Sequence, residues 1–475
     1  MGKNKIIKLD VIKNHFVKLY NSERPAVFFN NCSISHKNLI AQSLSLAKGL
    51  EKKGLNKSDK IVIQLENSVE FIYCYLATLF GGYTIIPLDT SLGKSFYDYI
   101  IQITQPKLII NDVNQLCFEK NHDFFFRTNI DSTYAIFFTS GTTGKPKGVC
   151  HSIGTLFNNA SSFNKFVGFD NNLVMMHVMP MGYMAGFLNT MLCPIASGGS
   201  IIIAPKFSFK NVFEFWSPAI NNNANSVWLS PTMLSLISKL TRNTEHISWV
   251  QQNIKNVFVG TAPLPETIKK QFRDKFSLNC FESYGLTETL IVATNKNSDE
   301  NKPNSVGEII PGAEIKLLKI EDYETNNYRI FVKSSYLFQK YFLEKDNNFI
   351  ENEWFLTGDL GFIDDDKYLY ITGREKDLII HGGMNVSPII VENVILELPG
   401  IDDVIVVGKP HEFWGEEVVA FIKVGNQKNM DKSKLIEHCK SVLSPDAVPS
   451  MFIEIDQIPR TSTGKPKKFE LLSTL

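Results

Sequence analysis

The sequence has no excess of charge of either sign. Its 475 residues include 49 Lys and Arg and 49 Asp and Glu, so the formal net charge is zero. A chain without net charge exerts no long-range attraction on nucleic acid or on an anionic membrane surface. We therefore expect no nucleic-acid partner, and a ligand that is a small molecule or a protein met through a local patch.

Closely spaced cysteines are missing. The seven cysteines are odd in number, scattered along the chain and without a C-x-x-C pair. Disulfide frameworks use even, regularly spaced sets, and zinc sites use short paired spacings. Both are disfavoured, and the expected localisation is a reducing cytoplasm.

Long uninterrupted apolar runs are also missing. The first ten residues contain lysines and no apolar core, so we expect no signal peptide. Residues 171–205 contain no Asp, Glu, Lys or Arg, which alone would suggest a membrane helix. Pro180, Gly186 and Pro194 are among the residues that interrupt this stretch, so it predicts a buried helix and strand and no membrane span.

A segment rich in glycine, hydroxyl groups and lysine follows the apolar run 134–138. It reads Thr-Ser-Gly-Thr-Thr-Gly-Lys-Pro-Lys-Gly-Val over residues 139–149. Glycines let backbone N–H groups approach an anion closely, while hydroxyls donate hydrogen bonds and lysines supply charge. The pattern is typical of a loop that wraps a polyphosphate; the alternative is a solvated loop. The residues expected to contact phosphate are Thr139, Ser140, Gly141, Thr142, Thr143, Gly144 and Lys147.

The spacing within this segment excludes the common P-loop. That motif reads G-x-x-x-x-G-K-S/T, whereas Gly141 and Gly144 are three positions apart and Pro146 follows Lys145. A different phosphate-binding architecture is therefore expected.

Short β-branched or apolar runs alternate with helical-looking stretches over most of the chain. This alternation predicts an α/β fold with parallel sheets, whose ligands bind beyond the carboxyl ends of the strands. The glycine-rich segment follows one such run, as a binding loop should. The other expected strands cover 60–64, 83–86, 107–110, 200–203, 226–229 and 256–259.

The length and the change of texture along the chain predict more than one domain. From about 307 to 366, short strand-like pieces separated by turn residues suggest an antiparallel or barrel-like section. After Arg374 a smaller unit follows, with an expected helix at 388–398 and strands at 404–407 and 418–424. We place a domain boundary near 374–377.

Tyr284-Gly-Leu-Thr-Glu288 follows the strand-like residues 279–281. After an expected tight turn at Tyr284 and Gly285, Thr287 and Glu288 suit a phosphate oxygen and a hard cation, because Mg²⁺ takes one or two carboxylates and completes its shell with phosphate and water. The alternative for this pentapeptide alone is an ordinary helix start.

Three more residues complete a candidate nucleotide site. Asp359 and Arg374 are an acid and a base suited to the two hydroxyls of a ribose. Lys465 lies in the short polar segment 459–465, where a solvated tail lysine is the alternative interpretation.

Taken together, these segments resemble the adenylate-forming superfamily of acyl-CoA synthetases, firefly-type luciferases and nonribosomal peptide adenylation domains. The match keeps the same order from about Ala26 to Lys465, nearly the whole chain. It also includes residues 59–67, 260–264, 305–307 with 311–312, and 382–388 ending in Glu392.

The resemblance implies a fold, a domain scheme and a reaction. The large N-terminal domain, residues 1–373, would contain two doubly wound α/β subdomains and a β-barrel-like subdomain. Residues 374–377 would form a hinge, and 378–475 a small mobile α+β domain. A carboxylate would attack the α-phosphate of ATP to give acyl-AMP and pyrophosphate, and a thiol, usually of coenzyme A, would then displace AMP.

The resemblance also assigns site residues. Residues 139–149 would hold the β- and γ-phosphates, and Gly260, Thr261 and Ala262 would enclose adenine with Tyr284 and Gly285. Thr287 would contact the α-phosphate, Glu288 with Thr139 would bind Mg²⁺, and Asp359 would hold the ribose with help from Arg374. Lys465 would be the catalytic lysine, Lys376 the hinge, and Gly382 and Gly383 the loop at the thiol tunnel. Tyr183, Met184, Gly186 and Val259 would line the acyl pocket.

The chain departs from the family pattern at informative positions. Tyr183 stands where many acyl-CoA synthetases have histidine, so it is expected to shape the acyl pocket or to be a core tyrosine. Amino-acid-activating relatives carry an aspartate in this region, and 171–205 has none, which disfavours an α-amino acid. Tyr341 follows Lys340 where Gly-Tyr is frequent, a difference that the resemblance places away from the chemistry.

We therefore expect an ATP-dependent acyl-CoA synthetase that uses Mg²⁺ and a carboxylic acid. One alternative is a stand-alone acyl-AMP ligase that loads a carrier protein or an amine; the short stretch 312–354, without the insertion of such ligases, favours coenzyme A. A remote alternative is an inactive nucleotide-binding protein, against which Glu288, Asp359, Arg374 and Lys465 together argue. No residue supports a luciferase-like activity.

Overall fold

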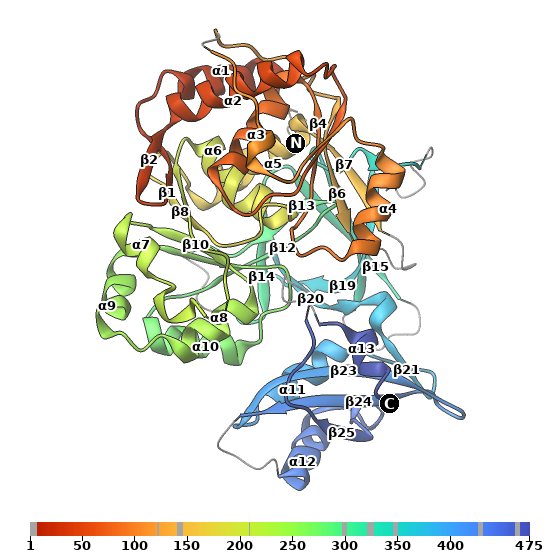
Figure 1. Cartoon of the computed structure of the whole chain (residues 1–475). Helices are drawn as coiled ribbons and strands as arrows, with labels where there is room; N and C mark the ends of the chain where they lie inside the picture. Colours follow the sequence, from red (N-terminus) through yellow and green to blue (C-terminus); the bar gives the residue numbers. More distant parts are fainter. Residues whose placement is uncertain are drawn as a thin grey trace.

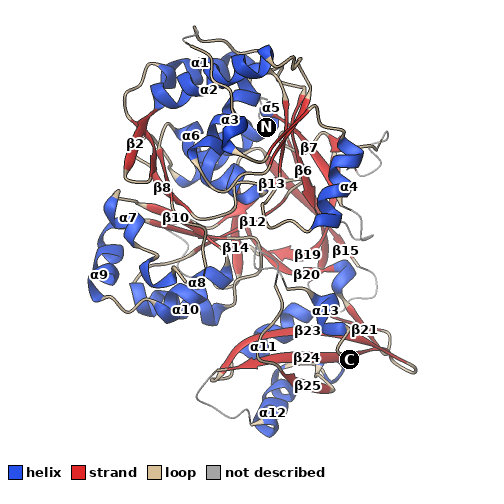
Figure 2. Ribbon diagram, in the orientation of Figure 1, coloured by secondary structure: helices blue, strands red, loops and turns tan. Residues whose placement is uncertain are grey.

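The computed structural model of the chain has a large N-terminal part and a small C-terminal part, the latter lowest in Figure 1. It describes residues 7–120, 123–139, 146–208, 210–296, 302–320, 327–344, 350–425, 431–460 and 466–475. The sheets are mixed and helices cover them, so the predicted α/β class is confirmed (Figure 2).

A six-stranded sheet carries the glycine-rich segment. Its strands β3, β4, β5 and β6 pair in parallel, whereas β7 pairs with β6 and β17 with β7 in antiparallel fashion. The order is β17 (Lys340–Tyr341), β7 (Lys147–Ser152), β6 (Thr133–Thr139), β4 (Thr84–Pro87), β3 (Lys60–Ile63) and β5 (Leu108–Ile110).

A fourteen-stranded sheet joins the second α/β unit to the antiparallel section. Its first half contains β2 (Cys32–Ser35), β1 (Pro25–Phe29), β9 (Ser200–Ile203), β8 (Val174–His177), β10 (Ser226–Leu229), β11 (Asn256–Val259) and β12 (Phe281–Leu286). Its second half contains β13 (Leu290–Thr294), β14 (Ser305–Ile309), β20 (Tyr368–Arg374), β19 (Trp354–Ile363), β16 (Tyr328–Ser334) and β15 (Ala313–Lys319), with β18 (Ile350–Glu351) beside β19.

One local prediction was wrong. Tyr284 and Gly285 do not form a tight turn but lie inside β12, which pairs with β11 on one side and β13 on the other. The register shifts between these two residues, as at a β-bulge. Gly285 is needed there because a Cβ on it would lie 1.9 Å from the Leu290 carbonyl oxygen.

Helices cover the N-terminal sheets, and their ends follow from local sequence. Ser68 caps α3 by accepting a hydrogen bond from the Phe71 N–H, and the helix ends at Gly82 in the left-handed conformation. The helices are α1 (Leu9–Tyr20), α2 (His36–Lys52), α3 (Val69–Gly81), α4 (Lys94–Thr104), α5 (Ile153–Val167), α6 (Cys193–Ser197), α7 (Ser217–Asn221), α8 (Pro231–Leu240), α9 (Thr244–Asn253) and α10 (Glu266–Phe276).

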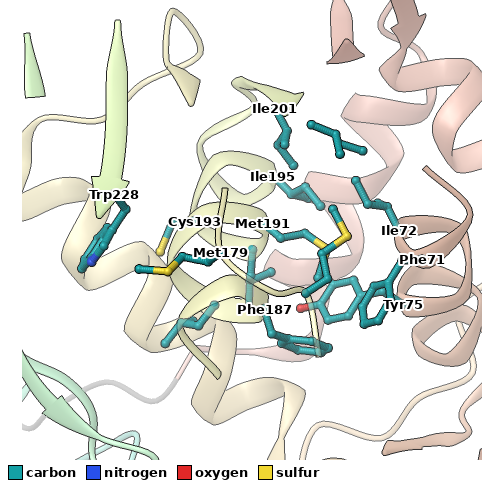
Figure 3. Packing of buried hydrophobic residues seen from close by; sticks show 14 of the residues in the cluster. Phe71, Ile72, Tyr75, Met179, Phe187, Met191, Cys193, Ile195, Ile201 and Trp228 are labelled. Atoms are coloured by element: carbon teal, nitrogen blue, oxygen red, sulfur yellow. The ribbon is translucent and has the colours of Figure 1, made fainter. Parts of the chain in front are cut away.

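The charge-free stretch 171–205 lies in the core. It forms β8, the π-helix Ala185–Leu192 (η2), α6 and β9, so the predicted buried helix and strand are confirmed. Figure 3 shows Phe187 and Met191 of η2 facing Phe71 and Tyr75 of α3, and the Tyr75 and Phe187 ring centroids are 4.0 Å apart. Across the described ranges, no helix combines the length and the apolar character that crossing a membrane requires.

The C-terminal part has its own five-stranded sheet and core. Its strands are β21 (Ile379–His381), β22 (Met384–Val386), β23 (Ile401–His411), β24 (Gly415–Val424) and β25 (Met451–Glu454), and its helices are α11 (Pro388–Leu396), α12 (Lys432–Val442) and α13 (Lys468–Leu472). Glu392 ties α11 to β23 by accepting a hydrogen bond of 2.9 Å from the Val406 N–H. Burial raises the pKa of Glu392 to about 6.

Candidate active site

The base of the glycine-rich loop is a hairpin. Thr139, the last residue of β6, lies opposite Lys147, the first residue of β7. The Lys147 ammonium is 4.9 Å from the centroid of the Tyr341 ring and 3.8 Å from a carboxylate oxygen of Glu344. Of the residues predicted to contact phosphate, Ser140, Gly141, Thr142, Thr143 and Gly144 lie outside the described residues.

Thr287 and Glu288 lie in the turn between β12 and β13, so the alternative of a helix start is wrong. The Thr289 hydroxyl closes the turn by accepting a hydrogen bond of 3.0 Å from the Leu286 N–H. The Glu288 carboxylate accepts a hydrogen bond of 2.9 Å from the Tyr341 hydroxyl.

Two residues at this turn escaped the sequence interpretation. Tyr341, expected to lie away from the chemistry, contacts the predicted metal ligand Glu288 directly. Burial, followed by the Glu288 charge, raises the pKa of Tyr341, so its hydroxyl stays protonated and donates. His151 on β7 contacts the Thr287 carbonyl oxygen at 2.7 Å. In the sequence, only its position shortly after the glycine-rich segment could have pointed to His151. No local sequence pattern indicates the contact of Tyr341 with Glu288.

Tyr284, Asp359 and Arg374, which are predicted to contact the nucleotide, are joined to one another by hydrogen bonds. The Tyr284 hydroxyl donates to one Asp359 carboxylate oxygen at 2.7 Å, and Arg374 Nε donates to the other at 2.7 Å. Asp359 is 3% exposed and lies opposite Arg374 in the β19–β20 pair. Burial and the Asp359 charge raise the pKa of Tyr284 well above its ordinary value, so it remains a donor. The carboxylate is thus held in a fixed orientation by two donors.

The segment Gly260, Thr261 and Ala262 follows β11. A Cβ on Gly260 would lie 2.9 Å from Ser283 Oγ and 3.4 Å from Trp228 Nε1, so only glycine fits there without displacing a neighbour. Thr261 has a φ of 74°, which is rare for a β-branched residue and marks local strain. Within the described part of the chain, Thr261 Oγ1 and Trp228 Nε1 are both buried without a hydrogen-bond partner.

The predicted acyl-pocket residues come from two segments. Tyr183 is partly exposed, which argues against the alternative of a core tyrosine, and Met184 is buried to 9% exposure. Gly186 permits close backbone approach, because a Cβ on it would lie 2.1 Å from the Pro180 carbonyl oxygen. Val259 ends β11 and is buried.

Asn67 fixes the backbone that carries Tyr183 and Met184. Its side chain donates to the Met179 carbonyl oxygen at 2.8 Å and accepts from the Met181 N–H at 2.9 Å. The segment is thereby tied to the loop that follows β3.

The oxygen ligands of this site suit a magnesium ion that arrives bound to a nucleotide. No group of three or more His, Cys, Asp or Glu side chains is arranged to hold a metal among the residues that the structure describes. Magnesium bound with phosphates needs only one or two protein carboxylates. Glu288, oriented by Tyr341, offers one carboxylate, so the site fits the ion.

The hinge and thiol-tunnel predictions fall on short turns. Lys376 lies in the 3₁₀ turn Glu375–Asp377, directly after β20, and Glu375 accepts two hydrogen bonds from Arg329. Gly382 and Gly383, with φ of 59° and 86°, form the turn between β21 and β22. Glycine adopts positive φ values without steric cost, which explains why both positions of this turn are glycine.

Lys465 lies outside the described residues. The residues that flank it, Arg460 and Pro466, form an isolated β-bridge, and Arg460 is held by two hydrogen bonds of 2.7 and 2.8 Å to Asp403.

Two family models match the chain. The model described as AMP-binding enzyme matches residues 15–125 and 126–342, and the model of the AMP-binding enzyme C-terminal domain matches 390–465. Together they cover most of the chain.

Curated relatives match over nearly their whole length. The chain is 26% identical to a 2-succinylbenzoate–CoA ligase of Bacillus subtilis, covering 93% of each sequence. It is 25% identical to a mitochondrial malonate–CoA ligase of Mus musculus, covering 92% of this chain and 85% of the relative.

Solved structures agree. ATP-bound MatB from Rhodopseudomonas palustris superposes with a TM-score of 0.87 at 26% identity, covering 97% of this chain and 98% of that one. The o-succinylbenzoate CoA synthetase of Bacillus subtilis with its acyl-adenylate intermediate gives a TM-score of 0.84 at 26% identity, covering 96% and 97%. The same synthetase has been solved with ATP and magnesium and gives 0.83.

The predictions of an adenylate-forming enzyme, of its fold and of its use of ATP and Mg²⁺ are therefore confirmed. The chain belongs to the family of AMP-binding enzymes, and it is an AMP-forming acid–thiol ligase of the acyl-CoA synthetase type.

Proposed function

We propose that this ligase activates an organic acid without an α-amino group and transfers the acyl group to coenzyme A. In the first step the carboxylate attacks the α-phosphorus of ATP and the bond to pyrophosphate breaks. In the second step the thiol attacks the acyl carbon, AMP leaves, and the thiol proton is lost. A carboxylate is a poor acyl donor, and AMP supplies the leaving group that it lacks.

One continuous series of contacts supports this proposal. Arg374 binds Asp359, which binds Tyr284. Three residues further along β12 and its turn, Thr287 contacts His151 on β7. The next residue, Glu288, contacts Tyr341, whose ring lies beside Lys147 at the base of the loop. The order of these contacts, from Arg374 to Lys147, is the order that the proposed ribose, α-phosphate, magnesium and polyphosphate roles require, and it supports the proposal.

We assign roles accordingly. Asp359 and Arg374 bind the ribose, Thr287 the α-phosphate, Glu288 with Thr139 the magnesium ion, and residues 139–147 the pyrophosphate that leaves. Lys465 stabilises the charge that develops between carboxylate and α-phosphate, because preorganised donors act most strongly where charge builds. Lys376 is the proposed hinge between residues 1–373 and 378–475, and Gly382 with Gly383 the proposed border of the thiol tunnel.

The acceptor and the compartment are proposed on separate grounds. The relatives named above are CoA ligases, and the stretch 312–354 is short, so coenzyme A is favoured over a carrier protein. All seven cysteines are free thiols, which fits the reducing cytoplasm.

Acid-dependent pyrophosphate exchange tests the proposal. Purified protein with ATP, Mg²⁺ and a panel of short, medium, aromatic and hydroxylated acids should exchange labelled pyrophosphate into ATP only when an accepted acid is present. Coenzyme A should then yield a thioester, and a phosphopantetheinylated carrier protein should not compete with it. Nucleotide binding without exchange on any acid would support the inactive-protein alternative, and transfer to the carrier alone would support the acyl-AMP ligase.

We further propose that the accepted acid carries an oxygen acceptor beyond its reacting carboxyl group. Among the residues that the structure describes, Trp228 Nε1 and Thr261 Oγ1 have no hydrogen-bond partner; both are buried donors near Gly260, which follows the proposed acyl residue Val259. A buried donor is costly unless a partner satisfies it, so a substrate oxygen there gains affinity. The named acids of two relatives, malonate and 2-succinylbenzoate, both carry such oxygens.

Trp228→Phe tests the position of this acceptor. The variant should lower kcat/KM for an acid with the distal oxygen by about 10-fold to 100-fold, as the loss of one buried hydrogen-bond partner predicts. An alkyl analogue of the same length should be little affected. Trp216→Phe is the matched control, because it removes another buried indole N–H that has no hydrogen-bond partner in the described ranges, from a ring that packs against Phe215 and Phe276. Equal losses for both acids would contradict the proposed contact.

A further inference from the structure

We infer that His151 is a positioning residue of this ligase, which holds the Thr287–Glu288 peptide against β7, the strand that follows the glycine-rich segment. The inference rests on the proposed roles of Thr287 and Glu288. His151 lies on β7 and is fully buried, with no exposed surface. Its Nε2 is 2.7 Å from the Thr287 carbonyl oxygen, although 136 positions separate the two residues in sequence.

The contacts of the imidazole determine its tautomer. A carbonyl oxygen only accepts hydrogen bonds, so Nε2 must carry a hydrogen. Burial lowers the pKa of His151 to about 4, so the ring is neutral near pH 7 and Nδ1 keeps its lone pair. The Thr155 hydroxyl is 3.2 Å from Nδ1 and 2.9 Å from the Ser152 carbonyl oxygen. That hydroxyl donates to the Ser152 carbonyl oxygen, so the hydrogen bond that fixes the tautomer is the one from Nε2 to the Thr287 carbonyl oxygen.

This contact orients the peptide between the two proposed functional residues. In a trans peptide the carbonyl and the following N–H point in opposite directions, and the described chain has no cis bond. With the Thr287 carbonyl directed at His151, the Glu288 N–H points away from β7. Two further contacts act on Glu288, through the Phe338 N–H at 2.9 Å and the Tyr341 hydroxyl. His151 acts on the Thr287 side, where the α-phosphate is proposed to bind.

The expected consequence is on kcat rather than on nucleotide binding. A displacement of about 1 Å in a positioned group lowers the rate about 100-fold. The contacts of Asp359 with Tyr284 and Arg374 do not involve His151, so KM for ATP should change little.

Two substitutions at one position separate positioning from folding. In His151→Gln the side-chain amide nitrogen reaches approximately as far as Nε2, so it still donates to the Thr287 carbonyl oxygen. In His151→Asn it reaches only as far as Nδ1. The Gln variant should keep kcat for acid-dependent exchange within about fivefold, the loss that a hydrogen bond of poorer geometry explains. The Asn variant should lose about 100-fold in kcat at unchanged KM for ATP.

The pH profile adds a readout that distinguishes a positioning residue from a general base. Because His151 is neutral from well below pH 6, the Gln variant should show the wild-type dependence of kcat between about pH 6 and 9. The inference is overturned if the Gln variant loses an ionisation that the wild-type pH profile shows. It is also overturned if the Gln and Asn variants have equal kcat values and equal melting temperatures. If the Asn variant does not fold, the folded Gln variant decides, and a loss above about tenfold there overturns it.

Failure of the proposed function gives a different result. Wild-type protein without exchange on any acid contradicts the proposed function, and the inference falls with it. Wild-type exchange together with equal Gln and Asn variants contradicts the role of His151 alone.

Discussion

Lys465→Ala is expected to lower the rate of acyl-AMP formation by about 10²- to 10³-fold, the effect of removing one preorganised donor from a developing charge. Lys465 is proposed to contact both the attacking carboxylate and the α-phosphate, so the first half-reaction should need it. Transfer of the acyl group from preformed acyl-AMP to coenzyme A should proceed at about the wild-type rate, because the proposed rotation about the hinge at Lys376 withdraws Lys465 from the site before that step. Single-turnover measurements of each half-reaction provide both rates.

Lys467→Ala is the matched control for this experiment. Lys467 is two positions away and its ammonium pairs with Glu470 at 2.7 Å on the surface. Exposed pairs of this kind contribute little to stability, about 0–1 kcal/mol. The control should retain both half-reactions. Equal loss of both half-reactions in Lys465→Ala would show that the lysine supports the fold or the nucleotide generally, and the proposed catalytic role would be abandoned.

The chemistry of this site was readable from sequence because each motif is local. The glycines, hydroxyls and lysines of 139–149 are contiguous, and their types alone indicate phosphate binding. Asp359 and Arg374 were predicted to share one ligand, and β19–β20 pairing places them opposite each other. The strands that carry these motifs were also found, since short apolar runs between helices have a clear pattern.

Contacts between segments that are far apart in the sequence could not be predicted. Tyr284 and Gly285 look like a turn because glycine favours turns, yet pairing of β12 with β11 and β13 extends the strand through a bulge. The two-residue strand β17 is too short for any periodicity, and it exists only because Lys340 and Tyr341 pair with β7. The Tyr341 contact with Glu288 follows from that pairing, so no local rule reveals it.

The contact of His151 could not be predicted from sequence for the same reason. A single histidine shortly after a glycine-rich segment predicts nothing by itself, because its function depends on which carbonyl group lies beside it in the folded chain. The carbonyl belongs to Thr287, in a turn whose position depends on the long sheet. Positioning residues of this kind become visible only once the chain is folded.

Asp359→Ala is expected to weaken both nucleotide binding and the fold. Two hydrogen bonds that the ribose hydroxyls would donate to this carboxylate account for about 3 kcal/mol, so the Kd of Mg-ATP should rise about 100-fold. The free energy of unfolding should fall by about 2–3 kcal/mol, because the Tyr284 hydroxyl becomes a buried donor without its acceptor. The Arg374 side chain keeps 38% of its surface in water, so its loss of a partner should cost less than the ~3–5 kcal/mol of a fully buried pair.

Thermal unfolding with and without Mg-ATP measures both effects on the same protein. Wild-type protein at 100 times Kd should gain about 2.7 kcal/mol of stability from the nucleotide, and the Asp359→Ala variant should gain almost none at that concentration. Asp366→Asn is the control: this carboxylate is 70% exposed and pairs with Lys302 on the surface, so neither the melting temperature nor the nucleotide-induced shift should change appreciably.

The two readouts for Asp359 separate its two proposed roles. If Asp359 only supported the fold through Tyr284 and Arg374, the variant would melt at a lower temperature but gain the wild-type stabilisation from Mg-ATP. If it bound the ribose alone, Asp359→Asn, which keeps an acceptor for Tyr284, would melt near the wild type and still lose the nucleotide-induced shift. The hydrogen bonds from Tyr284 and Arg374 orient the carboxylate before the nucleotide arrives, so we expect Asp359→Ala to lose both.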